Sequence, residues 1–282
     1  MRLGEMPWTE VREAIARGVT AVVSLGSIEE HGPHSPGGDY IIVDEIGARA
    51  TDLSGDVITP TLPFGYSEYF RNYPGTITLR SETLAAVLTD TIDSLLLHGF
   101  PRVVILNGHN GNTATVEIVA RRYRRSHGLV IPSIAPFQII QAPDLIERVY
   151  GGKVELGHGG EPIGSLMMYL RPERVQLHRA GAFGRQQVFG VPTDGLGAIK
   201  VNGVRAAVPL DMEDVTPPTG SLSDPKLGSA GRGRQLLEYA VQACAGFFKW
   251  FRTVDPHLGT GAPADTPPGS MKSKPAPRGG AR

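Results

Sequence analysis

The chain has 282 residues, of which 40% are hydrophobic, and its 28 basic and 28 acidic residues cancel to a net charge of zero. This balance gives no basis for a nucleic-acid or anionic-membrane partner, and no apolar run approaches the roughly 18 residues that a membrane helix needs. The single cysteine, Cys244, excludes an intramolecular disulfide and is typical of a reducing compartment, so we expect a cytoplasmic protein.

Helices and strands alternate along the first half of the sequence. We predict helices over residues 9–16, 41–53, 81–98 and about 113–125, and strands over residues 20–25, 57–62, 102–106 and 129–134. The segment 63–76 is rich in aromatic residues, Pro and Gly and predicts a long loop, a feature that is often functional in compact domains. The alternation predicts βαβ units and a parallel sheet that helices cover on both faces.

The second half of the sequence is less regular. We predict a helix over residues 166–170, loops and short strands over 181–203, and a last helix over 229–252. Cys244 falls on the apolar side of that last helix, which favours a buried side chain over a reactive one. Pro, Gly, Ser and Ala dominate from residue 254 onward. The sequence therefore predicts one domain over residues 1–252 and a disordered tail over 253–282.

Ligand-type side chains gather directly after the strand at 20–25. Glu29, His31 and Asp39 lie close together in the sequence, and a divalent metal is the simplest group that would satisfy them together. His109 follows the strand at 102–106, and the carboxyl ends of parallel strands collect ligands at one edge of a sheet. We therefore predict that these four side chains converge on a metal site, where the two oxygens of Asp39 could bridge two ions.

Other polar residues near these positions receive different assignments. Glu30 is adjacent to Glu29, so its side chain should point the opposite way, and we expect it to be structural or exposed. We expect His34 to support the site rather than to bind metal. His158 and Glu161 lie three residues apart before the predicted helix at 166–170. They could supply one metal ligand and one acid or base, and their spacing alone does not separate these roles.

Four segments also form an ordered set of motifs. They are residues 24–34 (Ser-Leu-Gly-Ser-Ile-Glu-Glu-His-Gly-Pro-His), 73–76 (Tyr-Pro-Gly-Thr), 107–112 (Asn-Gly-His-Asn-Gly-Asn) and 158–161 (His-Gly-Gly-Glu) with Ser165. Together they resemble the motifs of the creatininase family of metal-dependent amidohydrolases across most of residues 7–252. The resemblance implies a three-layer α/β/α sandwich with a mostly parallel central sheet. It also implies a centre of two divalent ions, zinc first with manganese or iron as alternatives, and a homo-oligomer, often a hexamer.

The resemblance carries residue roles onto matching positions. It implies four metal ligands, of which Asp39 is the bridging one: Glu29, His31, Asp39 and His109. Some members of the family have a further glutamate ligand where this chain has Gly111, and Glu161 is our candidate for that fifth ligand. His158 matches a family histidine near the substrate, where it could donate a proton or stabilise a tetrahedral intermediate.

Three departures from the family pattern bear on the substrate. The spacer between His31 and Asp39 is one residue shorter, Gly157 stands where creatinine hydrolases carry Glu, and residues 163–165 are Ile-Gly-Ser where Glu-Thr-Ser is common. These departures argue against creatinine, against the peptide-trimming members of redox-cofactor biosynthesis, and against the pterin- or flavin-pathway formamide hydrolases.

We accordingly predict hydrolysis of a small, cyclic, non-peptide amide. A metal-bridging hydroxide would attack the carbonyl carbon, His158 and Glu161 would handle proton transfer, and the aromatic residues of 66–73 would wall the pocket. Two alternatives stay open. One is hydrolytic ring opening at a C–C bond of a cyclic diketone such as a diketo-inositol. The other is an inactive, metal-stabilised scaffold or sensor, which the vacancy at Gly111 allows.

Overall fold

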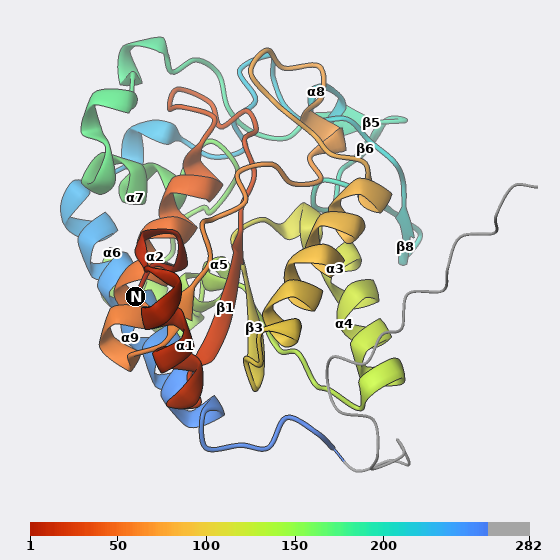
Figure 1. Ribbon diagram of the computed structural model, residues 1–282. Coiled ribbons are helices and arrows are strands. Elements are labelled where there is room, and N and C mark those ends of the chain that lie inside the picture. The colour runs from red at the N-terminus through yellow and green to blue at the C-terminus, as the bar shows by residue number, and fades with distance from the viewer. Residues whose placement is uncertain (259–282) are drawn as a thin grey trace, which may run out of the picture.

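A four-stranded parallel sheet lies at the centre of the computed structural model, which describes residues 1–258 (Figure 1). The strand order is β2-β1-β3-β4, with bounds Val57–Ile58 for β2, Thr20–Leu25 for β1, Arg102–Asn107 for β3 and Ser133–Ile134 for β4. All three neighbouring pairs are parallel, and β1 and β3 pair along their whole length. The predicted parallel sheet is therefore confirmed.

Helices cover both faces of this sheet. One face carries α2 (Gly38–Ser54), α5 (Pro136–Ile140), α6 (Pro143–Tyr150), α7 (Ile163–Leu170) and α9 (Ala230–Phe251). The other carries α1 (Trp8–Ala16), α3 (Ser81–Leu97) and α4 (Thr113–His127). Because successive strand residues point to opposite faces, Val22 and Val104 enter the first core and Val23 and Ile105 enter the second. The molecule is thus the predicted three-layer α/β/α sandwich.

Shorter elements lie near the carboxyl ends of the strands, where Leu196 and Leu210 share a cavity with His109. Two antiparallel ribbons are formed by β5 (Gln187–Val188) with β6 (Val191–Pro192) and by β7 (Ala198–Val201) with β8 (Val204–Ala207), and α8 (Met212–Val215) follows them. Short 3-10 helices span Leu3–Glu5, Glu68–Phe70, Asn110–Asn112, Pro172–Arg174, Leu177–Arg179 and Pro225–Leu227. Of these, the 3-10 helices at Glu68–Phe70 and Asn110–Asn112 and the segments that flank β7 and β8 line the cavity at the carboxyl ends of the strands.

Several element boundaries differ from the predicted ones. The strands β2 and β4 are short because Pro60 and Pro132 carry no N–H for the sheet. The helix α2 begins at Gly38, so Asp39 lies in its first turn, where a carboxylate is favoured by the helix dipole. The prediction missed α5 and α6, each of which begins with a proline at a position that suits a helix start.

The last described residues, 253–258, are attached to the domain. The Arg102 side chain donates a hydrogen bond to Val254 O at 2.8 Å, and Val130 N donates to Pro256 O at 2.9 Å. Folded structure thus continues past the predicted boundary at 252. The rest of the predicted tail, 259–282, lies outside the described residues. Within residues 1–258, the helices are all too short or too polar to cross a bilayer.

Candidate metal centre

Two loops and one helix start deliver the candidate ligands to the same edge of the sheet. The loop after β1 carries Glu29 and His31, the loop after β3 carries His109, and Asp39 enters from the first turn of α2. The two loops are adjacent because β1 pairs with β3, and Gly108 N donates a hydrogen bond to Leu25 O at 2.8 Å just beyond the paired strands. The predicted convergence at the carboxyl ends of the strands is therefore what the fold produces.

The carboxylate of Asp39 lies between the two imidazoles. Its Oδ1 is 3.4 Å from His31 Nε2, and its Oδ2 is 2.9 Å from His109 Nδ1. Glu29 also faces both rings, with Oε1 3.9 Å from His31 Nε2 and Oε2 3.3 Å from His109 Nε2. All four residues are at most 5% exposed. The shorter spacer before Asp39 thus does not remove this residue from the site.

Backbone carbonyls orient the two imidazoles. The Nδ1 of His31 lies 3.1 Å from Glu29 O, and the Nε2 of His109 lies 2.8 Å from Tyr66 O. If these nitrogens carry the protons, the opposite nitrogens present lone pairs to carboxylate oxygens. His31 Nε2 is buried and has no hydrogen-bond partner. Such an arrangement of lone pairs requires a proton or a cation between them, so the donor set fits a divalent metal.

The pKa shifts of the four residues also favour a cation at this site. Burial disfavours a charged imidazole, but Asp39 and Glu29 outweigh it and raise the pKa of His31 to about 9. Burial also lowers the pKa of His109, but Glu29 and Asp39 outweigh this effect and raise that pKa to about 9. Burial also raises the pKa of the Glu29 carboxyl, whereas the two histidines hold the pKa of Asp39 below its usual range despite burial. Positive charge at this position is therefore strongly favoured.

Polar residues around the ligands hold them in place. Ser67 is fully buried, donates a hydrogen bond to Glu29 Oε2 and lies 3.1 Å from His109 Nε2. Asn112 ties the loops together, since its Oδ1 accepts from Tyr66 N at 2.8 Å and its Nδ2 donates to Gly26 O at 3.1 Å. Ser67 was not predicted as a site residue, because a serine within an aromatic loop carries no recognisable pattern.

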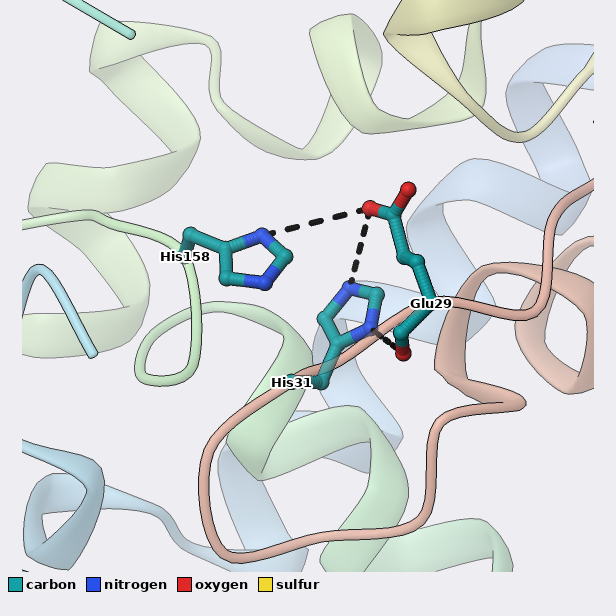
Figure 2. Close-up of side chains that lie close together, drawn as sticks. All are labelled: Glu29, His31 and His158. Atoms are coloured by element: carbon teal, nitrogen blue, oxygen red, sulfur yellow. Dashed lines mark hydrogen bonds and ion pairs between the residues drawn. The ribbon is translucent and has the colours of Figure 1, made fainter. Parts of the chain in front are cut away.

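The structure also brings His158 to the site. Its ring stacks on His31 with a centroid distance of 4.3 Å, and its Nδ1 lies 4.0 Å from Glu29 Oε1 (Figure 2). Two groups of potential metal donors result, and they share Glu29: one with His31 and His158, the other with Asp39 and His109. The family resemblance implies that His158 lies near the substrate; the structure places it on the wall of the cavity beside Glu29, and its role stays a prediction.

Glu30 and His34, which we predicted not to bind metal, both lie beside the candidate ligands. The side chain of Glu30 is only 11% exposed, and its carboxylate accepts a hydrogen bond from Gly32 N and lies beside His158. His34 is buried, its Nδ1 lies 3.3 Å from Ser35 O, and its ring stacks on His31 at 5.2 Å. Both therefore support the site, and Glu30 is not exposed.

Glu161 is placed differently from its expected role as the fifth ligand. It is fully buried and lines the cavity, but its Oε1 accepts from Ser165 Oγ at 2.6 Å and its Oε2 accepts from Tyr150 OH at 2.9 Å. It belongs to neither group of potential metal donors. Gly111 cannot be replaced by a ligand side chain in this backbone, because a Cβ at this position would overlap Tyr66 O and the His109 ring.

A cavity of about 830 Å³ opens onto the ligands. Tyr66, Tyr69 and Phe70 form its aromatic wall, as predicted for this loop. Arg71 and Asp211, an ion pair with an Nη1–Oδ1 distance of 2.9 Å, also line it. The volume lies in the range of pockets that enclose small molecules.

Comparison with known proteins identifies relatives over most of the chain. The family model "Creatininase: Creatinine amidohydrolase" matches residues 4–248. The chain is 27% identical to creatinine amidohydrolase of Pseudomonas putida, over 86% of this chain and 94% of that protein. It is 25% identical to a mycofactocin precursor peptide peptidase of Mycobacterium ulcerans, over 86% and 89%. It is also 25% identical to 3-dehydro-scyllo-inosose hydrolase of Thermotoga maritima, over 43% and 39%.

Solved structures agree with this relationship. A manganese form of creatininase is 26% identical and superposes with a TM-score of 0.72, covering 90% of this chain and 99% of that one. A variant creatininase of the Zn–Zn type is 25% identical with a TM-score of 0.74, covering 90% and 98%. The family model spans nearly the whole described domain, and three of the four motifs resembling that family contribute residues to the site. The fourth motif is joined to it through Thr76 Oγ1, which accepts a hydrogen bond from Glu30 N at 3.1 Å. The chain therefore belongs to the creatininase family of hydrolases.

Proposed function

We propose that this protein is a metal-dependent hydrolase that cleaves a small, cyclic, non-peptide amide with the help of two divalent ions. The observation that carries the proposal is the convergence of two buried carboxylates and two oriented imidazoles at the base of a small-molecule cavity, with His31 Nε2 unpartnered. A buried polar nitrogen without a partner is costly, and a bound cation removes that cost.

The contacts favour a division of the ligands between two ions. Glu29, Asp39 and His109 would hold the first ion, and His31 with the other Asp39 oxygen would hold the second, which makes Asp39 the bridging ligand. Zinc is the proposed metal, with manganese and iron as alternatives. Imidazole with carboxylate suits all three, and the similar creatininase structures include manganese and Zn–Zn forms.

When bound, such ions lower the pKa of a coordinated water to near 7 and polarise a carbonyl oxygen. The residues of the chain prepare the site for this chemistry. Ser67 fixes the carboxylate of Glu29, and the aromatic wall limits the access of bulk water. Tyr69 lines the cavity, and its hydroxyl, which is protonated at neutral pH as in any ordinary tyrosine, can donate a hydrogen bond to a substrate oxygen.

Glu161 fits a positioning role better than the ligand or proton-transfer role expected from the sequence. Both of its oxygens already accept hydrogen bonds, from Ser165 and Tyr150. A carboxylate so engaged holds the start of α7 beside the cavity.

A second candidate function is hydrolytic C–C ring opening of a cyclic diketone. The similarity to 3-dehydro-scyllo-inosose hydrolase supports it, although that similarity covers 43% of the chain. The same ligands serve both reactions, since each begins with attack of an activated water on a carbonyl carbon. Gly157 stands where creatinine hydrolases carry Glu, and residues 163–165 are Ile-Gly-Ser where Glu-Thr-Ser is common in the family. Both departures argue against creatinine and against peptides.

Metal analysis of the purified protein tests the centre. We expect about two ions per chain in the wild type, and a loss of at least one ion in Glu29→Ala and in His109→Ala. Glu173→Ala and His178→Ala are the matched controls, because both side chains are exposed. A metal content well below one ion per chain that does not change in the two variants contradicts a dinuclear site.

A substrate panel then separates the functions. It contains lactams, formamides, diketo-inositols, creatinine and short peptides. Turnover of a cyclic amide that depends on Glu29 and His109 supports the proposal. Turnover confined to the diketo-inositols supports the second candidate, and full metal content without any turnover supports the inactive scaffold or sensor.

The proposal also includes a homo-oligomer, with a hexamer as the expected size, and a cytoplasmic location. Family resemblance supports the first. A single cysteine that is buried in α9 is compatible with the second. Light scattering on the purified protein measures the assembly.

A further inference from the structure

We infer that His158 is a ligand of the second ion, and that Glu30 fixes the tautomer and orientation of its ring for this purpose. The inference rests on the proposed dinuclear centre and revises the proton-transfer role that the sequence suggested for His158. It concerns what completes the second site, for which His31 and one oxygen of Asp39 provide only two donors.

Three potential donor atoms of Glu29, His31 and His158 lie close together. His31 Nε2 and His158 Nδ1 both face Glu29 Oε1, at 3.9 Å and 4.0 Å, and the three atoms all lie within 4.8 Å of one another (Figure 2). The rings of His31 and His158 stack at 4.3 Å with an angle of 26° between their planes. Two imidazoles that direct nitrogens toward one carboxylate oxygen form a site that is suited to zinc.

Hydrogen bonds fix which nitrogen of His158 faces this point. Its Nε2 contacts the carbonyl oxygen of Glu30 and lies 3.4 Å from Glu30 Oε2, so it is the nitrogen that donates. The other nitrogen, Nδ1, is then left with a lone pair directed toward Glu29. Because His31 is oriented in the same way by Glu29 O, two nitrogen lone pairs and a carboxylate oxygen face one another. A cation relieves their mutual repulsion.

Glu30 supplies the charge behind His158. Its Oε1 accepts from Gly32 N, and its Oε2 is buried without a hydrogen-bond partner on the side of His158. The backbone carbonyl of Glu30 holds the tautomer of the ring, and a negative charge 3.4 Å from the far nitrogen of a metal-bound imidazole raises the basicity of the ring. This arrangement gives a physical role to the partly buried carboxylate of Glu30.

Packing restricts His158 further. Phe70 stacks on the ring at 4.5 Å, as does His31 at 4.3 Å. Gly111, in the loop that carries His109, supplies no donor, because it has no room for a side chain. The ring of His158 is stacked against two neighbours and hydrogen-bonded through Nε2, so it has little freedom to move. Such a fixed ring is suited to binding an ion and poorly suited to donating a proton to a leaving group.

Metal binding by variants of the two histidines tests the inference. His158→Phe keeps an aromatic ring beside Phe70 and removes both nitrogens. His178→Phe is the control, because it makes the same substitution at an exposed histidine that does not line the cavity. The readouts are metal stoichiometry, calorimetric titration with Zn²⁺, and the visible absorption spectrum of the Co²⁺-substituted protein.

The expected pattern is specific to the second ion. In His158→Phe we expect the first ion to bind as in the wild type and the second about 100-fold more weakly, with a changed Co²⁺ spectrum. Glu30→Gln keeps the ring and should weaken the second ion about 10-fold. His178→Phe should bind two ions with wild-type affinities.

Two negative results have different meanings. Wild-type affinity for both ions and an unchanged Co²⁺ spectrum in His158→Phe overturn the ligand role and leave the dinuclear hydrolase intact. A wild-type protein that binds fewer than two ions overturns both proposals. Circular dichroism shows whether His158→Phe folds. If it does not fold, the affinity of Glu30→Gln for the second ion decides whether His158 is a ligand: a weaker second ion supports the inference and a wild-type affinity overturns it.

Discussion

Asp39 is the residue on which the charge balance of the site depends. Its two oxygens face two different imidazoles, at 3.4 Å and 2.9 Å, and Glu29 faces the same pair of rings. Two buried carboxylates in this position need compensating positive charge. Protons on His31 and His109 can supply it in the metal-free protein, and metal ions can supply it in the loaded one.

This competition predicts proton release upon metal binding. Because the pKa values of His31 and His109 are raised to about 9, both rings are protonated at pH 7 without metal and must lose a proton to coordinate. The affinity for Zn²⁺ should therefore rise with pH up to about 9 and weaken below it. Calorimetric titration in buffers of different ionisation enthalpy measures the protons released. A binding enthalpy that is independent of the buffer at pH 7 contradicts the expectation.

Cys244 provides a second prediction for a single residue. It is fully buried, as its place in the apolar pattern of the last helix predicted, and burial raises the pKa of its thiol to about 12. The reactive thiolate is therefore scarce at pH 8. We expect slow labelling of the native protein by a thiol reagent and rapid labelling in denaturant. Equal rates in the two conditions are incompatible with this burial.

At the scale of elements, the contact between α7 and α9 links the core to the cavity. α7 carries Ser165, which holds Glu161, and α9 approaches it closely through Gly233. A Cβ at Gly233 would overlap the carbonyl oxygen of Ser165. The absence of a side chain at this position in α9 therefore sets how near α7 lies, and with it the position of Glu161.

Two glycine substitutions in α9 test this contact. Gly233→Ala forces the two helices apart and should lower the free energy of unfolding by about 1–3 kcal/mol. Gly246→Ala is the matched control in the same helix, because a Cβ there meets no atom within 4 Å. It should raise stability by up to about 1 kcal/mol through helix propensity. Denaturant unfolding measures both, and equal effects of the two substitutions contradict a close helix contact.

At the scale of the whole molecule, the segment 253–258 joins the end of α9 to the far side of the sheet. It covers Leu129 through the bridge to His257, and Pro256 is buried there. Hydrogen bonds from Arg102 to Val254 O, from Val130 to Pro256 O and from Arg124 to Leu258 O hold it. The domain therefore uses residues that the sequence assigned to the tail.

Truncation tests that boundary. A chain that ends at residue 252 loses these hydrogen bonds, and we expect it to be about 2 kcal/mol less stable than a chain that ends at residue 258. Thermal and urea unfolding of the two truncated proteins give the comparison. Identical stabilities mean that residues 253–258 contribute nothing to folding.

The sequence by itself determined the features that depend on local patterns. Apolar runs predicted β1 and β3, helical periodicity predicted α3 and α9, and the position of Glu29, His31 and His109 after strands predicted a shared site. These inferences succeed because periodicity and strand ends are encoded by neighbouring residues. They fail at α5 and α6, which are short and begin at prolines, and at the short strands β2 and β4.

Only the tertiary structure decided how the side chains meet. It brought Ser67 from the aromatic loop onto Glu29, engaged Glu161 with Tyr150 from the unpredicted α6, and stacked His158 on His31. The physical reason is that these contacts join residues that are distant along the chain. Their distances depend on how loops pack over the sheet edge, which no local pattern records.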